Sequence, residues 1–171
     1  MRPANRNEEL RRVYREHVDA VYAFLAYSVG RQVAEDLTAT TFERVLRHWN
    51  RYDAAKASER TWILSIARNA LIDHYRRSAH RDATSLDEHP LIAERLATQA
   101  DPIADALSAD AFTGWLALLG DRDRTVLAMR YGADLSAAEI AEALELTEAN
   151  VHQIASRAVR RLRALVDPDE T

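Results

Sequence analysis

Apolar side chains recur at steps of three and four residues through most of this 171-residue chain, which is the period of a helix buried on one side. No stretch of useful length alternates apolar and polar residues as a half-buried strand would. The chain also has only four glycines and four prolines, which are too few for the many turns of a sheet protein. We therefore expect an all-α fold.

The stretch from Arg60 to Arg81 combines a core face with a basic, amide-bearing face. At about 100° per residue, one side of this predicted helix is apolar, with Ile63, Ile66, Ala67, Ala70 and Leu71. The opposite side offers hydrogen-bond donors and hydroxyls, from Thr61, Ser65, Arg68, Asn69 and Arg76. This second face suits a nucleic acid, but an ordinary solvated helix face is the alternative, and other stretches must decide.

Two further helices are predicted before this stretch, over residues 8–29 and 33–49. Gly30 can end the first of them. The second has an apolar flank of Phe42, Leu46 and Trp49, which either packs inside a helical bundle or docks a partner protein. Residues 51–60 show no apolar period and are expected to form a loop, which is either a base pocket ahead of the basic helix or a plain connector.

The character of the chain changes after residue 81. Pro90, Pro102 and a run of acidic residues predict a linker over residues 82–106, which spans at most about 80 Å when extended. Compact helical structure is expected beyond it, with a helix over residues 103–119 and a second one capped by Asp121 and ended at Gly132.

The last two predicted helices resemble a DNA-reading motif. Ser136 and Glu139 form a capping box for the first, and Thr147 can cap the second after a short turn. The second helix has an apolar stripe at steps of four and three, formed by Val151, Ala155, Ala158, Leu162 and Leu165. Its opposite face is polar and basic, with Asn150, His152, Gln153, Ser156, Arg157 and Arg160. This arrangement predicts a helix-turn-helix with a recognition helix, and an ordinary helical hairpin is the alternative.

The charge is unevenly distributed. The net charge is −4, but residues 1–80 have 14 basic and 10 acidic side chains, a net of +4. Residues 81–107 have two basic and six acidic side chains, and residues 108–171 have seven and eleven, so each part has a net of −4. Counterion release alone should hold such a chain weakly on free DNA, and we expect a larger partner to bring it there.

Composition excludes several classes of protein. The absence of cysteine excludes disulfides, thiolate zinc sites and a cysteine nucleophile. The first residues lack the apolar segment of a signal peptide, and no run of about 18 uncharged apolar residues exists, so we expect no membrane insertion and a cytoplasmic location. The six histidines lack metal-ligand spacing, and there is no phosphate-binding glycine loop. We therefore expect no enzyme, metal, cofactor or small-molecule substrate.

The chain resembles bacterial sigma factors of the extracytoplasmic-function (ECF) group within the sigma-70 family. The first half has VYREHVDAVYAFL, AEDLTATTFERVLRHWNRYD and RTWILSIARNALIDHYRR in the family's order. The second half has LGDRDRTVLAMRYGADLSAAEIAEALELTEANVHQIASRAVRRLR. The resemblance implies sigma region 2 over residues 8–81, an acidic linker over 82–106, and the region 4 helix-turn-helix over 107–167. It also implies a protein that binds core RNA polymerase, recognises promoter DNA and helps to open it.

The resemblance assigns roles to residues of the first half. Polymerase binding falls to Asp36, Leu37, Ala39, Thr40 and Glu43. The family commonly has Gln and Glu where this chain has Ala39 and Thr40, so two polar contacts are absent. Asn69 matches the position near the flipped base of the minus-ten element, where a carboxamide can pair with an exposed base edge. The phosphates of the opening strand fall to Arg60, Arg68, Arg76 and Arg77.

In the second half, the resemblance assigns minus-thirty-five recognition to the last helix. It assigns contacts with base edges to Asn150, Gln153, Ser156 and Arg157, and contacts with phosphates to Arg160 and Arg161. The family usually has Lys or Arg where this chain has His152, and Arg where it has Ile154, which weakens the attraction to phosphate.

The resemblance further implies an anti-sigma protein as a partner. Two rival functions stay open. One is a sigma-like mimic that sequesters an anti-sigma factor without binding promoters, and the other is a helix-turn-helix repressor that binds DNA alone.

Overall fold

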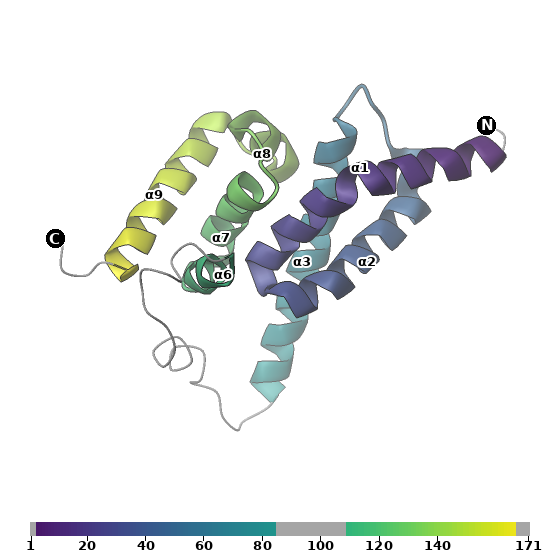
Figure 1. The fold of residues 1–171 in the computed structure, drawn as a ribbon. Coiled ribbons are helices and arrows are strands. Elements are labelled where there is room, and N and C mark those ends of the chain that lie inside the picture. The colour runs from purple at the N-terminus through teal and green to yellow at the C-terminus, as the bar shows by residue number, and fades with distance from the viewer. Residues whose placement is uncertain (1–2, 85–108, 167–171) are drawn as a thin grey trace.

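A computed structural model describes residues 3–84 and 109–166, and these residues form helices with no strand among them (Figure 1). The expected all-α fold is confirmed. The first half contains α1 (Pro3–Val29), α2 (Arg31–His48), the short 3-10 helix η1 (Trp49–Arg51) and α3 (Glu59–Thr84). The second half contains α6 (Ala109–Ala117), α7 (Asp121–Leu127), the π-helical turn η2 (Ala128–Gly132), α8 (Ala137–Leu144) and α9 (Glu148–Val166).

Helices α1 and α2 form an antiparallel hairpin that turns at Gly30. This glycine has a φ of +82°, a conformation that side-chain-bearing residues rarely adopt, so its role as the end of the first helix is confirmed. On α2, Phe42 meets Tyr14 edge to face with ring centroids 4.8 Å apart, and in η1 Trp49 packs against Trp62. Phe42 and Trp49 are buried, whereas Leu46 is 49% exposed. Two of the three residues of the predicted flank therefore belong to the core.

Helix α3 buries a wider arc than the sequence indicated. Ile63, Ala67 and Leu71 are buried as expected, but so are Leu64 and Thr61. The placement of Thr61 on the polar face was wrong, because its backbone N–H donates to Ser58 Oγ at 3.1 Å and the two hydroxyls lie 2.8 Å apart, which fixes the buried start of the helix.

The ends of α3 also differ from the expectation. The helix begins at Glu59, inside the predicted loop, and continues to Thr84, three residues beyond the predicted boundary. The remaining residues of the predicted linker, 85–106, lie outside the described part of the chain.

Hydrogen-bonded caps mark the starts of two helices in the second half. Ser136 and Glu139 form the predicted capping box at α8, and Asn150 N–H donates to Thr147 Oγ1 at 3.2 Å at the start of α9. The expected cap at Asp121 was wrong, because Gly120 is the N-cap of α7 and Asp121 is its first residue. The observed α6 covers residues 109–117 of the predicted helix, of which residues 103–108 are not described.

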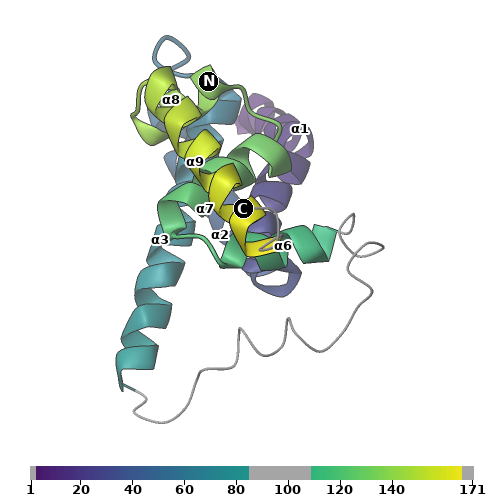
Figure 2. The same ribbon diagram turned by 90° about the vertical axis from the view of Figure 1, so that its left-hand side faces the viewer.

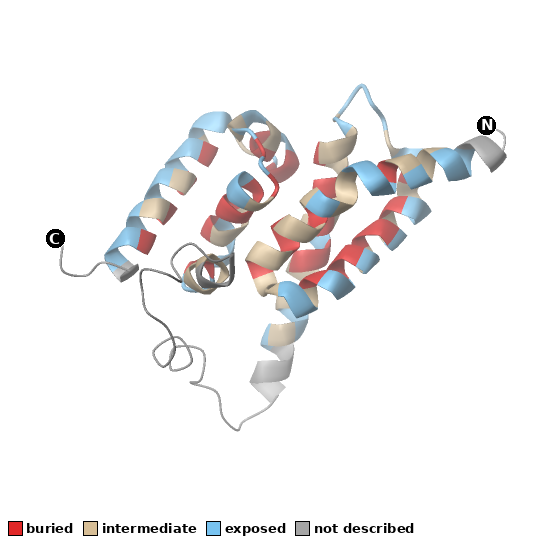
Figure 3. Cartoon of the chain, viewed as in Figure 1, coloured by how far each residue is buried: buried red, intermediate tan, exposed pale blue. Residues whose placement is uncertain are grey.

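The two halves share one hydrophobic core and pack directly against each other. Helix α6 and the η2 turn lie on α1, and α8 lies on α3 (Figures 1 and 2). Helix α9 is on the outer side of the second half, with its buried face turned inward and its exposed face turned away from α1 to α3 (Figure 3). Among the described residues, the helices are each too short or too polar to span a bilayer.

Candidate polymerase and nucleic-acid interfaces

The α2 residues assigned to polymerase binding lie mostly on an exposed face. Asp36, Ala39 and Glu43 are exposed at steps of three and four residues, which places them on one side of the helix. Thr40 is half-buried, and its hydroxyl donates to the Asp36 carbonyl at 2.9 Å. Leu37 is only 4% exposed and packs into the core, so its side chain orients α2 and does not present a contact surface.

The α3 residues assigned to the minus-ten element are divided between two environments. Asn69, Arg76 and Arg77 are exposed. Arg60 and Arg68 are half-buried and face the second half of the chain. The Arg60 guanidinium donates to the Ala133 carbonyl.

Arg60 also lies 3.9 Å from a Glu139 carboxylate oxygen. The pKa of Glu139 is below its usual range, mainly because the Ser136 backbone N–H donates to it, so its charge stays available to Arg60.

Arg124 and Tyr75 join the two halves at the middle of α3. Arg124 Nη1 lies 3.3 Å from the Tyr75 hydroxyl, and its guanidinium carbon lies 5.6 Å from the centre of the Tyr75 ring. The remaining nitrogens of Arg124 donate to the carbonyls of Leu116, Ala117 and Leu119 at the end of α6. Burial raises the pKa of Tyr75, which therefore stays a neutral donor to the Ser28 carbonyl at 3.2 Å.

The predicted recognition helix, α9, presents a polar outer face. His152, Gln153, Ser156, Arg157 and Arg160 are exposed, and Asn150 is half-buried. Ile154 is only 2% exposed, so the position where the family usually has Arg is a core position in this chain.

Two of the α9 arginines are tethered to α7. Arg157 Nη2 donates to Asp123 Oδ1 at 3.1 Å, and Arg161 Nη1 donates to Asp123 Oδ2 at 2.8 Å. The Asp123 side chain is only 5% exposed, whereas those of the two arginines are about half exposed. Asp123 was missed by the sequence reasoning, because its spacing from α9 carries no local signal. It links the predicted recognition helix to α7.

An ion-pair network links α1 to the start of α3. Arg12 donates to both Glu59 oxygens, at 2.7 and 3.1 Å, and to Glu16 at 2.6 Å. The Arg12 hydrogen bonds hold the pKa of Glu59 below its usual range, and His17 Nε2 lies 3.5 Å from the same carboxylate.

The possible ligand atoms of Glu16, His17 and Glu59 all lie within 4.8 Å of one another. Arg12 already supplies the counter-charge of both carboxylates, so this cluster is best described as an ion-pair network and not as a metal centre.

Comparison with known families divides the chain at the same place as the fold. The family description of sigma-70 region 2 matches residues 13–81, and that of sigma-70 region 4 matches residues 115–164. The ECF RNA polymerase sigma factor BldN of Streptomyces coelicolor is 30% identical over 159 residues, which cover 92% of this chain. The chain spans 60% of the length of that relative. The ECF RNA polymerase sigma factor SigM of Bacillus subtilis is 29% identical over 154 residues, covering 90% of this chain and 92% of SigM.

Solved structures share the arrangement of helices. The sigma factor RpoE in its complex with the anti-sigma factor NepR from Bartonella quintana superposes with a TM-score of 0.68 at 19% identity, covering 96% of this chain and 98% of that one. CnrH in complex with the cytosolic domain of CnrY gives the same TM-score at 20% identity, covering 96% and 91%. At these identities the likeness supports the fold alone. The two matched regions, in this order, together with the similarity to BldN and SigM, show that the chain belongs to the ECF group of the sigma-70 family of RNA polymerase sigma factors.

Proposed function

We propose that this chain binds core RNA polymerase, directs it to promoter DNA and promotes opening of the duplex at the start of transcription. The observation that carries the proposal is the pairing of a region 2 helical unit with a region 4 helix-turn-helix whose polar face on α9 points outward. We keep residues 8–81 and 107–167 as the two functional units.

Polymerase binding is assigned to the exposed face of α2. The carboxylates of Asp36 and Glu43 offer charge-assisted contacts to basic residues of the polymerase. Glu43 is paired with Arg47 at 2.6 Å, and both side chains are about two-thirds exposed, so this pair can exchange for an intermolecular one at little cost.

Minus-ten recognition is assigned to α3. Asn69 is exposed and offers a donor and an acceptor to the edge of an unstacked base. Arg76 and Arg77 are exposed about two turns further along the helix, where they can hold phosphates.

The packing of the halves limits access to this face. The packing of the two halves seen in the structure is called the closed arrangement here. In it, Arg60 donates a hydrogen bond to the Ala133 carbonyl, and Arg68 faces α7 and α8, so neither is free for DNA. Full engagement of the minus-ten element therefore requires the second half to move away from α3, and polymerase is the partner that can hold the halves apart.

Minus-thirty-five recognition is assigned to α9, which remains accessible in the closed arrangement. Asn150, Gln153 and Ser156 offer side chains to base edges in the major groove, and His152 is exposed beside them. Arg160 is exposed and is assigned the phosphate contact. Arg157 and Arg161 donate hydrogen bonds to Asp123, so they would contact DNA while bound to that carboxylate.

An anti-sigma protein is proposed as the second partner. RpoE and CnrH, which share this fold, are described in complexes with NepR and with the cytosolic domain of CnrY. A protein that covers the α2 face or locks the halves together would block polymerase binding. The proposal places the chain in the bacterial cytoplasm, where core polymerase and DNA are found.

Co-elution from a sizing column separates this function from its rivals. The proposal predicts that the chain elutes with purified core polymerase. Promoter DNA should elute with the complex of the two, and only weakly with the chain alone. A sigma-like mimic would not bring promoter DNA to the polymerase, and a repressor would bind DNA tightly without polymerase.

Asp36→Arg tests the α2 face, with Asp19→Arg on α1 as a matched exposed control. Equal co-elution of both variants would contradict the assignment of α2.

A further inference from the structure

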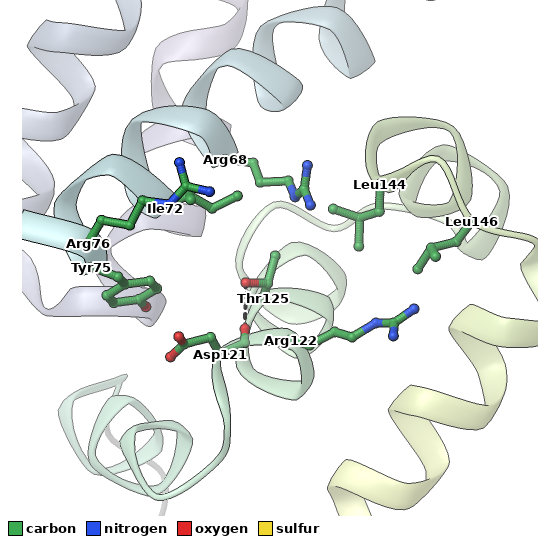
Figure 4. A pocket seen from close by; sticks show the side chains of 9 residues that line it. All are labelled: Arg68, Ile72, Tyr75, Arg76, Asp121, Arg122, Thr125, Leu144 and Leu146. Atoms are coloured by element: carbon green, nitrogen blue, oxygen red, sulfur yellow. Dashed lines mark hydrogen bonds between the residues drawn. The ribbon is translucent and has the colours of Figure 1, made fainter. Parts of the chain in front are cut away.

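A pocket lies at the junction of the two halves, between α3, the start of α7 and the end of α8 (Figure 4). Its volume is about 470 Å³, which lies in the range of sites for small organic molecules. Its walls are formed by Arg68, Ile72, Tyr75, Arg76, Asp121, Arg122, Thr125, Leu144 and Leu146.

The pocket has an excess of uncompensated positive charge. Arg68 and Arg76 come from α3 and Arg122 comes from α7, against a single carboxylate, that of Asp121. Within the described residues, no hydrogen bond or ion pair engages these three guanidinium groups. Other arginines at this junction are fully engaged, as Arg124 is with Tyr75 and the end of α6. Guanidinium groups at the wall of a pocket fit phosphate groups, which they bind through paired hydrogen bonds.

Ile72, Leu144 and Leu146 form the apolar part of the wall. Leu144 and Leu146 face Ile72 across the pocket, and Figure 4 shows Arg68 extending from α3 toward Leu144 and Arg122 extending from α7 on the side of Leu146. A planar heterocycle can therefore lie against these side chains, while phosphate groups attached to the same ligand meet the arginines. Inorganic phosphate would leave the apolar side chains of the pocket uncontacted.

We infer that this pocket binds a nucleoside polyphosphate, with the phosphates on Arg68, Arg76 and Arg122 and the base against Ile72, Leu144 and Leu146. The lining comes from both halves, so the ligand binds best when the halves are packed together and stabilises that arrangement in return.

The consequence for regulation rests on the proposed function, whereas the binding itself does not. Arg68 and Arg76 are also the cations assigned to the minus-ten strand. Ligand and promoter DNA would therefore exclude each other, and the ligand would hold the chain in its closed, inactive arrangement.

Titration calorimetry on the full chain, without added divalent cations, tests the binding. ATP and GTP are compared with sodium tripolyphosphate and with adenosine. We expect one site per chain for the nucleotides, an at least ten-fold weaker affinity for tripolyphosphate, no detectable binding of adenosine, and weaker nucleotide binding as salt is raised. Arg122→Ala should weaken nucleotide binding ten-fold or more, while Arg163→Ala, an exposed α9 arginine outside the pocket, should change it less than two-fold.

Arg122→Lys provides a second variant, since it keeps the charge and loses the planar fork, and should bind with intermediate affinity. Circular dichroism confirms that each variant is folded. Equal affinity of tripolyphosphate and ATP would overturn the assignment of the base, and equal losses in Arg122→Ala and Arg163→Ala, or no binding at all, would overturn the site. Arg122 has no role in the assigned DNA contacts, so failure here leaves transcription by the chain with core polymerase unaffected.

Discussion

Gly132 packs so closely against α1 that a β-carbon built on it would lie 3.0 Å from the carbonyl oxygen of Ala23. The same atom would lie 2.6 Å from Cδ2 of Tyr27. The ring of Tyr27 also meets Phe112 of α6 edge to face, with centroids 5.3 Å apart, so it is held on both sides. The η2 turn can approach α1 this closely only because residue 132 has no side chain.

Gly132→Ala should therefore wedge the halves apart. We expect a loss of about 1–3 kcal/mol in the free energy of unfolding and a larger radius of gyration in small-angle scattering, because backbone atoms of α1 cannot yield as a flexible side chain could. Gly120→Ala is the control, since nothing lies within 4 Å of a β-carbon there. An unchanged radius for Gly132→Ala would show that this contact does not hold the halves together.

Asp123→Asn should loosen the recognition helix. The substitution removes the charge that Arg157 and Arg161 share, and the site is buried on the aspartate side but open on the arginine side. We expect a loss of about 1–2 kcal/mol in urea unfolding, less than for a fully buried pair. Asp134→Asn is the matched control, because Asp134 is exposed with a φ of 51° and asparagine tolerates that conformation equally well. Equal stability of the two variants would remove Asp123 from its structural role.

Glu59→Gln should destabilise the fold in a pH-dependent way. The pKa of Glu59 is lowered in the folded state, mainly by Arg12, so its ionised form contributes stability above the unfolded-state pKa of about 4.5. That contribution is lost as the pH falls through the folded-state pKa. Urea titrations should show a deficit of about 1 kcal/mol at pH 7 that shrinks below pH 4.5. A deficit that is constant from pH 7 to pH 3 would mean that packing, and not the charge, is responsible.

Asn69→Ala should impair promoter opening more than polymerase binding. Loss of the carboxamide removes base-edge contacts, and we expect promoter opening to fall about ten-fold. Opening is measured by the permanganate reactivity of unpaired thymines. Co-elution with core polymerase should be unchanged, because Asn69 is exposed on α3 and is not among the α2 residues assigned to polymerase binding. Asn50→Ala provides an exposed amide control. Equal loss of opening and binding would count against the role given to Asn69.

The sequence predicted what depends on local spacing. The helical period, the hairpin turn at Gly30 and the capping box at Ser136 and Glu139 are short-range features, and they are confirmed. The burial of Thr61 was missed, because its bond to Ser58 depends on how the preceding loop folds back.

Long-range contacts of the candidate site could not be read from the sequence in the same way. Arg124 meets Tyr75 across 49 positions, and Arg161 meets Asp123 across 38. The period of a helix shows which face is polar, but it does not show which cation will be neutralised by a distant partner. The direct packing of the two halves was equally invisible, since a predicted linker says only that they can reach each other.

Mapping of RNA 5′ ends made by purified core polymerase on genomic DNA tests the central claim most directly. With this chain added, we expect the 5′ ends to gather at a limited set of positions that share sequence blocks near minus ten and minus thirty-five, and these positions should disappear when the chain is omitted. The same scattered 5′ ends with and without the chain would contradict its function as a sigma factor.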